Sequence, residues 1–404
     1  MKFNQLFSEQ IRFVMLWLII GSAFGCIFSQ MRSTELIADE YFHVPYIARI
    51  IEGDYTFPKY LTVPPTYHFL IAEIAKVFAL KTIASLRMIN MIIGLLCILA
   101  FYNLVEKTSP ESKNLKTFQF AFLPILFPFY FLNYTDVTSL LFVILSTSSA
   151  VSGKSFLSGV FGLISLLIRQ TNIFWVFFNF ILCFIDFFKN KNIGFNKKIV
   201  RDFSSYALSG GLFLLFFVLN HGFSLGDKET QKLTLNVSNI WFLIIMFAIL
   251  FPHDCIPNIW ASRKKLVTLK IPVLILLLGF AFWKTYEATC TYNHIPFYLR
   301  NLFLLWSTTN VFGKITAALL LLIGFCGMLF QKEKSIILII LLPITIISVV
   351  FLPLIEIRYY FICFSLYLAF KKDSNHTTNL LISTIYFVIS FYLMIEITKK
   401  SFFL

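Results

Sequence analysis

Apolar runs separated by short polar segments recur along the whole chain. A helix needs about 20 mostly apolar residues to cross the hydrocarbon layer of a bilayer, and most of these runs approach that length. They lie at residues 11–28, 88–105, 118–132, 137–151, 156–168, 172–188, 204–220, 237–252 and 379–396, with two more in each of 270–330 and 335–370. The pattern predicts an all-α polytopic membrane protein with about 13 transmembrane helices, folded as one domain over residues 1–404.

Two apolar runs need a separate interpretation. The run at 11–28 is longer than the apolar core of a usual signal peptide, and no small-residue cleavage site follows it, so we expect a retained signal anchor. The run at 66–80 is interrupted by Glu73 and Lys76. We interpret it as a helix that lies along the membrane interface rather than across the bilayer.

Lysine-rich segments between the runs indicate the cytoplasmic side. They lie at residues 106–116, 189–201, 262–265, 331–334 and 371–372. An even number of predicted spans separates neighbouring segments, so all of them fit on one side. The opposite side then receives residues 31–87, 133–136, 169–172, 220–230, 289–300 and 352–360, which hold most of the unusual polar residues. We expect these segments to assemble one site.

Composition agrees with this interpretation. The 404 residues are 58% hydrophobic and 13% charged, which leaves no room for a sizeable soluble domain. The net charge of +14 is explained by the lysine-rich cytoplasmic loops, and no basic and aromatic patch typical of nucleic-acid binding is present. The seven cysteines are scattered without a CxxC pair, so neither a disulfide framework nor a structural zinc site is indicated.

The stretch STELIADEYFHVP at residues 33–45 crowds carboxylates, a histidine and aromatic residues together. In a helix, Asp39 and His43 share a face and Glu40 lies beside them. A carboxylate sheltered by a membrane surface and by aromatic neighbours can serve as a general base. An ordinary solvated loop is the alternative, because carboxylates are common in loops.

Asp136 opens a predicted span in the stretch LNYTDVTSL. A carboxylate at the bilayer centre costs about 2.5 to 3.5 kcal/mol on insertion scales, so we expect Asp136 to stay at the membrane edge. Its alternative role is that of a helix N-cap.

Basic residues stand at the same predicted ends of the spans: Arg169, Lys228, Arg300 and Arg358. Each alone fits an interfacial residue whose charged head reaches the water. Together they could hold a phosphate, for which a planar guanidinium offers a two-point grip. Arg358 is the strongest candidate, because Glu356 and Tyr359 could orient it.

Two short matches do not support other sites. SGKS at residues 152–155 lacks the first glycine of a phosphate-binding loop, since position 148 is Ser148. PHDC at residues 252–255 contains metal-ligand types, but without a motif spacing and on the opposite predicted side. Because no DxD pair lies near Asp39, we expect chemistry without a metal and no cofactor.

Six motifs in order resemble one enzyme family: DEYFHVP (39–45), YTD (134–136), RQTN (169–172), GDK (226–228), FPH (251–253) and EIRYYF (356–361). The family is that of the endoplasmic reticulum α-1,2-glucosyltransferases, which add the last glucose to the dolichol-linked oligosaccharide. Each motif alone is a weak signal, but six in the same order and spacing cover most of the chain and are more specific.

The resemblance implies a C-type glycosyltransferase fold in the endoplasmic reticulum membrane, with a luminal site and with interfacial helices in a first luminal loop, residues 31–87. It implies dolichyl-phosphate-glucose as donor, a diglucosylated dolichol-linked oligosaccharide as acceptor, and inversion at the sugar carbon. By the family pattern an acidic residue of the first luminal loop is the general base, which assigns this role to Asp39, with Glu40 second.

A sugar phosphate already has a good leaving group, so the enzyme needs a base and cations but no acid. Arg358 is the first candidate for the donor phosphate, followed by Arg169 and His294. The other residues expected to contact substrate are His43, Tyr134, Asp136, Gln170, Asp227, Lys228, Glu356 and Tyr359.

One segment departs from the family. Where members tend to read Asp-Asn-Arg-His-Tyr, this chain has Thr291, Tyr292, Asn293, His294 and Ile295. The expected Asp and Arg are missing, which leaves His294 as the candidate contact from this segment and leaves room for altered specificity.

Other functions stay open on sequence alone. A transporter or lipid flippase predicts charges at mid-span and an internal repeat, whereas here the charges cluster at span ends. A non-catalytic membrane regulator with the same fold is a second alternative, because a fold does not guarantee activity. A transferase that uses dolichyl-phosphate-mannose is the nearest enzymatic one.

Overall fold

The computed structural model describes residues 2–189, 197–228, 232–266, 268, 270–290, 293, 301–331, 335–372 and 375–403. All regular secondary structure in these residues is helical, as predicted. The elements in chain order are α1 (Lys2–Met31), α2 (Glu40–Ile51), α3 (Thr66–Val77), α4 (Ile83–Thr108), η1 (Pro110–Ser112), α5 (Lys113–Ala121), η2 (Phe127–Tyr130), α6 (Thr135–Val151), α7 (Ser155–Ile168), η3 (Gln170–Asn172), α8 (Ile173–Lys189), α9 (Lys197–Asn220), α10 (Ser238–Leu250), α11 (Pro252–Ala261), α12 (Arg263–Leu266), α13 (Lys270–Thr285), α14 (Leu302–Thr309), α15 (Val311–Leu329), α16 (Ile336–Val350), η5 (Ile357–Tyr360), α17 (Phe361–Phe370) and α18 (His376–Thr398).

The long helices make the chain a multi-pass membrane protein. In the described part of the chain, six helical segments are long and apolar enough to cross a bilayer: Glu9–Met31, Ile83–Thr108, Gln170–Phe187, Val200–Asn220, Val311–Leu329 and His376–Thr398. A seventh candidate joins α10 and α11, which are bent by 91° where they meet. Further apolar helices, among them α6, α7 and α16, are 10–17 residues long. The predicted number of about 13 spans is therefore not confirmed.

The apolar run at residues 118–132 is not the continuous helix that its composition predicts. α5 ends at Ala121, and only the short 3-10 helix η2 follows before α6. Pro124 and Pro128 lack the amide hydrogens that the interior of an α-helix requires. Nearly every side chain in this segment is buried, so packing against the rest of the protein holds the segment in place. Its backbone forms turn hydrogen bonds such as Leu126 N–H to the carbonyl of Leu123.

This broken segment nevertheless runs back along α4. Phe120 stacks on Phe101 with ring centroids 4.0 Å apart. At the other end of α4, the side-chain amide of Asn90 donates to the carbonyl of Leu132 at 2.6 Å. The segment therefore returns the chain to the end of the bundle that carries the site.

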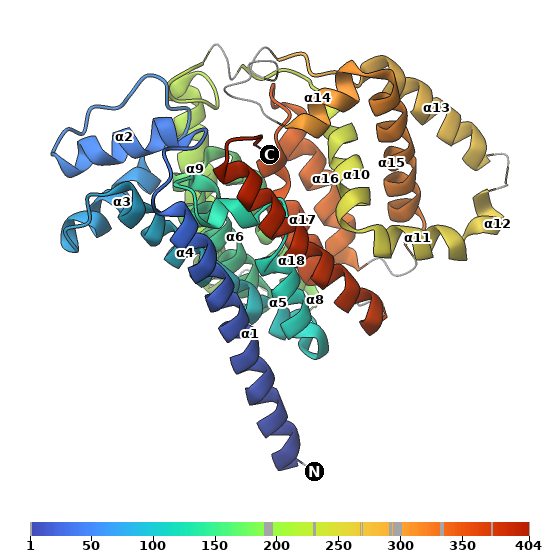
Figure 1. Ribbon diagram of the computed structural model, residues 1–404, viewed down its shortest axis with the longest axis horizontal. Helices are drawn as coiled ribbons and strands as arrows, with labels where there is room; N and C mark the ends of the chain where they lie inside the picture. Colours follow the sequence, from blue (N-terminus) through green and yellow to red (C-terminus); the bar gives the residue numbers. More distant parts are fainter. Residues whose placement is uncertain are drawn as a thin grey trace.

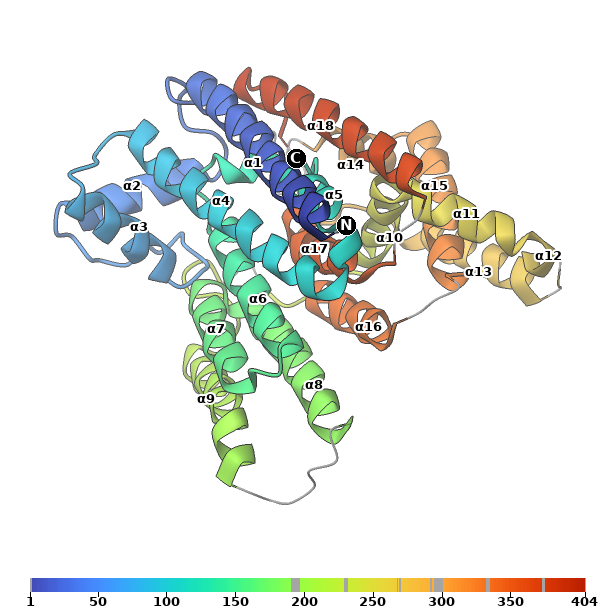
Figure 2. The ribbon, with the colours of Figure 1, turned by 90° about the horizontal axis from the view of Figure 1, so that it is seen from below.

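Helices α2 and α3 form a pair outside the bundle. Figures 1 and 2 place them at one end of the long axis of the molecule, with α12 and α13 at the other end. The run expected at residues 66–80 is helical from Thr66 to Val77. Its place at a membrane interface stays a prediction.

Four helix ends meet next to α2. Arg87 lies near the start of α4, Asp136 in the first turn of α6, Arg169 just after α7, and Arg358 in η5 before α17. Residues far apart in the sequence are thus brought to one end of the central helices. The predicted site forms there.

Candidate active site

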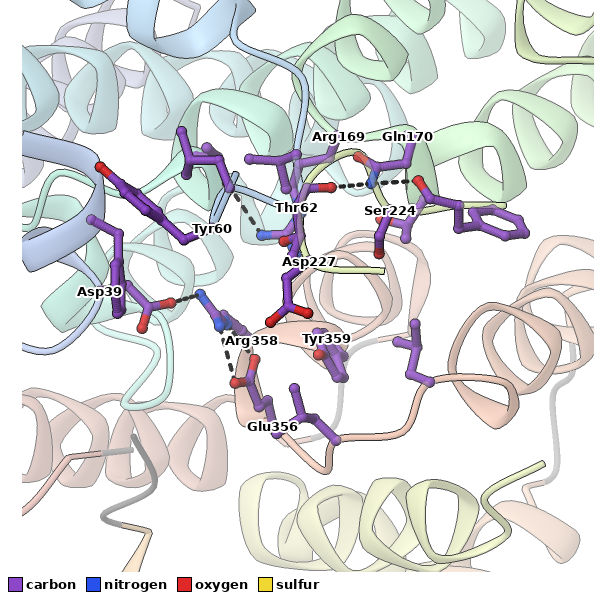
Figure 3. A pocket seen from close by; sticks show the side chains of 18 of the residues that line it. Asp39, Tyr60, Thr62, Arg169, Gln170, Ser224, Asp227, Glu356, Arg358 and Tyr359 are labelled. Atoms are coloured by element: carbon purple, nitrogen blue, oxygen red, sulfur yellow. Dashed lines mark hydrogen bonds and ion pairs between the residues drawn. The ribbon is translucent and has the colours of Figure 1, made fainter. Parts of the chain in front are cut away.

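A cavity of about 210 Å³ lies where the loop before α2 faces the ends of α7 and α9 and the segment before α17. Most of the predicted site residues line it: Asp39, His43, Arg169, Gln170, Asp227, Glu356, Arg358 and Tyr359. Figure 3 labels these residues except His43 and shows their side chains converging from separate elements. Of the six polar segments expected to share a site, those at 31–87, 133–136, 169–172, 220–230 and 352–360 all contribute to this cavity, and most of 289–300 lies outside the described residues.

The centre of the cavity is an ion pair between Asp39 and Arg358. Asp39 Oδ2 lies 2.7 Å from Arg358 Nη1, and Glu356 Oε1 accepts from Arg358 Nη2 at 3.0 Å (Figure 3). Glu356 also pairs with Arg358 Nε. The side chains of Arg358 and Asp39 remain 19% and 24% exposed, so solutes in the cavity can reach the pair. A cation and the carboxylate that pairs with it thus lie in one cavity that solutes can enter.

Asp39 is placed at the start of α2 without capping it. It occupies the N-cap position, but its side chain makes no capping hydrogen bond, because the carboxylate is directed to Arg358. The backbone N–H of Asp39 donates to the Tyr134 hydroxyl at 2.7 Å. The Arg358 guanidinium lies 5.7 Å from the centre of the Tyr134 ring. Tyr134, expected to contact substrate, is buried beneath the ion pair and supports it.

Arg169 supplies a second cation, paired with Asp136. Their side chains are 15% and 5% exposed. The other carboxylate oxygen of Asp136, Oδ2, has no hydrogen-bond partner in the part of the chain that the structure describes. Both residues line a smaller cavity of about 40 Å³ together with Tyr359, and Arg169 also lines the main cavity.

Gln170 connects two loops at the wall of the main cavity. Its Nε2 donates to the carbonyl of Thr62 at 2.7 Å and to the carbonyl of Phe223 at 2.8 Å (Figure 3). Because its Nε2 donates to backbone carbonyls of both loops, Gln170 fixes the shape of the wall. Its Oε1 has no hydrogen-bond partner among the described residues.

Glu40, the second candidate for the base, is fully buried and does not line the cavity. Its Oε2 lies 2.5 Å from Arg87 Nη2 and accepts from the backbone N–H of Ile37 at 3.1 Å. Its Oε1 accepts from the backbone N–H of Asn133 at 3.0 Å. Both oxygens of this carboxylate are thus occupied by donors of the protein and lie outside the cavity.

Arg87 is the residue that sequence reasoning missed. It stands near the start of an apolar helix, where a buried guanidinium requires a partner. It donates to Glu40 and also to the carbonyls of Met31 at 2.7 Å and Glu35 at 2.8 Å. An arginine at the edge of an apolar run was the signal that could have revealed it, although the sequence does not show which carboxylate it meets.

His43 forms a buried pair with His68, a second residue that the sequence analysis did not select. Nδ1 of His43 and Nε2 of His68 are 2.9 Å apart. Burial, helped by the positive charges of Arg358 and Arg169, lowers the pKa of His43 to about 3. Burial also lowers the pKa of His68. Both rings are therefore neutral near pH 7, and His43 faces the cavity as a neutral hydrogen-bonding group.

The remaining predicted residues have different outcomes. Asp227 lines the cavity (Figure 3). Lys228 does not line it, and its Nζ donates to the carbonyl of Asn220 at the surface at 2.7 Å. His294 and Arg300 lie outside the residues that the structure describes.

The FPH motif lies away from the cavity. His253 and Asp254 contact Lys371 at the end of α17 opposite to Arg358, with Lys371 Nζ 2.9 Å from Asp254 Oδ2. Across the described residues, no group of three or more His, Cys, Asp or Glu side chains is arranged to hold a metal ion. This motif therefore does not belong to the assembled site.

Comparison with known proteins agrees with the resemblance found in the motifs. The model of the DIE2/ALG10 family matches residues 33–198 and 179–369. A relative from Kluyveromyces lactis is 28% identical over 333 residues, which cover 71% of this chain and 60% of that protein. A human relative is 24% identical over 308 residues, covering 61% of this chain and 64% of that protein. Both are named Dol-P-Glc:Glc(2)Man(9)GlcNAc(2)-PP-Dol alpha-1,2-glucosyltransferase.

A solved structure shares the fold. The archaeal oligosaccharyltransferase AglB from Archaeoglobus fulgidus, solved with an inhibitory peptide and a dolichol-phosphate, superposes with a TM-score of 0.50 at 14% identity. The match covers 98% of this chain and 56% of AglB. The chain thus has the C-type glycosyltransferase fold, as predicted, and it spans about three fifths of the length of the two relatives above.

Proposed function

Because this chain belongs to the DIE2/ALG10 family, we propose that it is an inverting α-1,2-glucosyltransferase that moves glucose from dolichyl-phosphate-glucose to the diglucosylated dolichol-linked oligosaccharide. Relatives that match more than half of the chain carry the name of this activity. The observation that carries the proposal is the meeting of Asp39 and Arg358 at 2.7 Å in an accessible cavity. A base and a phosphate-binding cation are the two groups that the reaction requires.

In the proposed reaction Asp39 is the general base. The acceptor hydroxyl oxygen forms a bond to the anomeric carbon of glucose, and its proton passes to the Asp39 carboxylate. The bond between that carbon and the phosphate oxygen breaks, and the electron pair leaves with the phosphate. Attack from the face opposite to the phosphate inverts the configuration at the sugar carbon.

Arg358 is the proposed partner of the departing phosphate, with Arg169 beside it. Both guanidinium groups are paired with carboxylates in the structure, Arg169 with Asp136 and Arg358 with Asp39. A phosphate that binds Arg358 competes with Asp39 for Nη1, while Glu356 keeps its hold on Nε and Nη2. Donor binding thereby releases the Asp39 carboxylate toward the acceptor, and Glu356 keeps the guanidinium oriented.

An apolar cavity next to the polar one fits the lipid part of such a donor. It has a volume of about 620 Å³ and is lined by α8, α9 and α16. Phe223 lines both cavities, so the apolar space begins where the polar space ends. We propose that the polyisoprenoid chain of a phosphate bound at Arg358 or Arg169 extends toward this neighbouring apolar cavity.

The polar cavity faces the lumen of the endoplasmic reticulum in this proposal. Among the described residues of the lysine-rich segments, Lys107 lies at the end of α4 away from Arg87 and Lys371 at the end of α17 away from Arg358, where the positive-inside rule expects the cytosol. The glycan acceptor would enter from the luminal side past α2 and α3, which we propose lie at the luminal membrane surface. Glu40 and Arg87 then act as positioning residues for the loop that carries Asp39.

Reconstitution of the purified protein tests the proposal. Proteoliposomes are supplied with dolichyl-phosphate-glucose and the diglucosylated lipid-linked oligosaccharide, and the glycan is released and measured. We expect one added glucose in α-1,2 linkage, and none with dolichyl-phosphate-mannose. In cells, loss of the protein is expected to accumulate the diglucosylated precursor. A normal precursor profile in those cells together with no transfer in vitro would rule the function out.

A further inference from the structure

The chain reverses direction sharply after α18. Lys400 has a φ of +58°, in the left-handed region. Its N–H donates to the carbonyl of Ile397 at 3.0 Å, and the N–H of Ser401 donates to the carbonyl of Glu396 at 3.0 Å. This pair of bonds is a Schellman turn, which ends a helix and sends the chain back. Figures 1 and 2 show the following residues entering the middle of the molecule.

Phe403 is the residue that this turn inserts. It is buried, and its ring lies 5.7 Å from that of Phe129 and 6.1 Å from that of Tyr134, nearly parallel to the latter at 22°. Tyr134 accepts the backbone N–H of Asp39 and lies beneath the Arg358 guanidinium. One aromatic ring therefore connects Phe403 to both members of the ion pair.

A second contact reaches the same loop. Lys400 Nζ lies 2.5 Å from Glu35 Oε2, four residues before Asp39. The two side chains are 39% and 79% exposed, and exposed ion pairs contribute little. The aromatic contact of Phe403 is thus the stronger link between this segment and the site.

We propose that residues 400–403 position the general base, and that Phe403 is a positioning residue that acts through Tyr134. None of these residues lines the cavity, so the effect does not involve contact with substrate. Asp39 has no capping bond of its own side chain to fix it, and the Tyr134 hydroxyl holds its backbone. Removing the support beneath Tyr134 lets the carboxylate and Arg358 drift from their reacting positions. The assay for this inference rests on the proposed function.

The test compares Phe403→Ala with Phe402→Ala. Phe402 is the neighbouring half-buried phenylalanine, so its truncation controls for a general loss of apolar packing. A misplacement of about 1 Å can cost up to 100-fold in rate. We expect Phe403→Ala to lower kcat by about 10-fold or more with KM for the donor within about 2-fold of wild type. Phe402→Ala should leave kcat unchanged, and Phe403→Leu should restore most of it.

A double-variant cycle identifies the route. Tyr134→Phe removes only the hydroxyl that holds Asp39. If Phe403 acts through Tyr134, the double variant loses less rate than the product of the two single losses, as expected for coupled residues. Independent, multiplicative losses would overturn the route through Tyr134.

Hydrogen exchange supplies a readout that does not depend on activity. The peptide that contains Asp39 is expected to exchange faster in Phe403→Ala than in wild type or in Phe402→Ala. If wild type transfers no glucose, the proposed function fails, and this measurement still decides the positioning role. Wild-type kcat and unchanged exchange in Phe403→Ala would refute the inference while leaving the proposed function standing.

Discussion

Both ends of α17 carry a cluster of opposite charges with a histidine nearby, but only one cluster is accessible. Around Arg358, the side chains of the ion pair with Asp39 are 19% and 24% exposed and line a cavity. Around Lys371, roughly 20 Å away at about 1.5 Å per residue, the side chains of Lys371 and Asp254 are 2% and 11% exposed. The two clusters contain similar residue types, but solutes can reach only the one around Arg358.

The Lys371 cluster also uses its hydrogen-bonding capacity on the protein. Lys371 Nζ lies 2.7 Å from His253 Nε2, and the Tyr367 hydroxyl donates to Asp254 at 3.1 Å. The backbone carbonyl of Lys371 accepts from Lys116 Nζ at 2.6 Å, which joins this cluster to α5. A cluster so closed stabilises the junction of helices, whereas at the accessible Arg358 cluster we propose that a phosphate displaces a carboxylate. Matching motifs alone do not distinguish these two uses.

The largest effect is expected from Asp39→Asn, at the accessible end of α17 that carries Arg358 and is called the open end below. The amide keeps the shape of the side chain but cannot take the acceptor proton, so the transfer rate should fall by about 10² to 10⁴. Product formation in proteoliposomes measures this. Thermal unfolding should be nearly unchanged, in contrast to Glu40→Gln, which breaks a buried ion pair. Wild-type turnover by Asp39→Asn would remove Asp39 from the role of base.

At the closed end of α17, where Lys371 and Asp254 are buried, Lys371→Met should affect stability and not catalysis. The variant leaves Asp254 buried beside an apolar group, and breaking a buried pair typically costs about 3 to 5 kcal/mol. Thermal unfolding in detergent measures this loss. The double variant Lys371→Met with Asp254→Asn should recover part of it, because no charge is then left unpaired. A lower kcat per folded molecule, with unchanged unfolding, would contradict the division between the two ends.

Arg358→Lys sharpens the description of the open end. Lysine keeps the positive charge but loses the planar fork that Glu356 orients, so it cannot bind Glu356 and a phosphate oxygen in the same geometry. Removing a donor to a developing negative charge costs about 10² to 10³ in kcat. Arg169→Lys is the matched comparison. A larger loss from Arg169→Lys than from Arg358→Lys would assign the phosphate to Arg169.

The sequence predicted most of the helices and the gathering of the site. The runs at 137–151, 156–168 and 172–188 all form helices, because a continuous apolar segment in a bilayer must pair its backbone groups within itself. The positions of the lysines predicted that the segments carrying Asp39 and Arg358 share one side, but not that the two side chains pair. The local sequence pattern was sufficient to predict features that depend on a single helix, such as its existence and the side on which its ends lie.

Pairings across the fold could not be predicted. Asp39 and Glu40 are neighbours with the same chemistry, and only the three-dimensional arrangement directs one to the cavity and the other to Arg87. The break in residues 118–132 depends on how the segment packs against α4, which outweighs its apolar composition. Phe403 carries no sequence signal at all, since one buried phenylalanine among 50 is unremarkable in composition.

The smallest expected effect is the pH dependence of the free energy of unfolding that comes from His43 at the open end of α17. The pKa of His43 is about 3 in the folded protein, below the value of about 6.5 expected when the chain is unfolded. Between these values the unfolded state binds a proton that the folded state does not. The free energy of unfolding therefore falls as pH drops below about 6.5, by about 1.4 kcal/mol at pH 5.5 from His43 alone.

Thermal unfolding measured from pH 7.5 to pH 5 in wild type, His43→Gln and Lys371→Met checks this expectation. His43→Gln should flatten part of the pH dependence, because glutamine does not titrate. Lys371→Met should lower stability at every pH, but it is no neutral control for the slope, because Lys371 Nζ lies 2.7 Å from Nε2 of a second ionisable ring, His253. An equal slope in wild type and His43→Gln would show that His43 binds protons to the same extent in the folded and unfolded states, so that burial does not lower its pKa. In that case His43 would become a third cation in the cavity, beside Arg358 and Arg169, only as the pH falls below about 6.5.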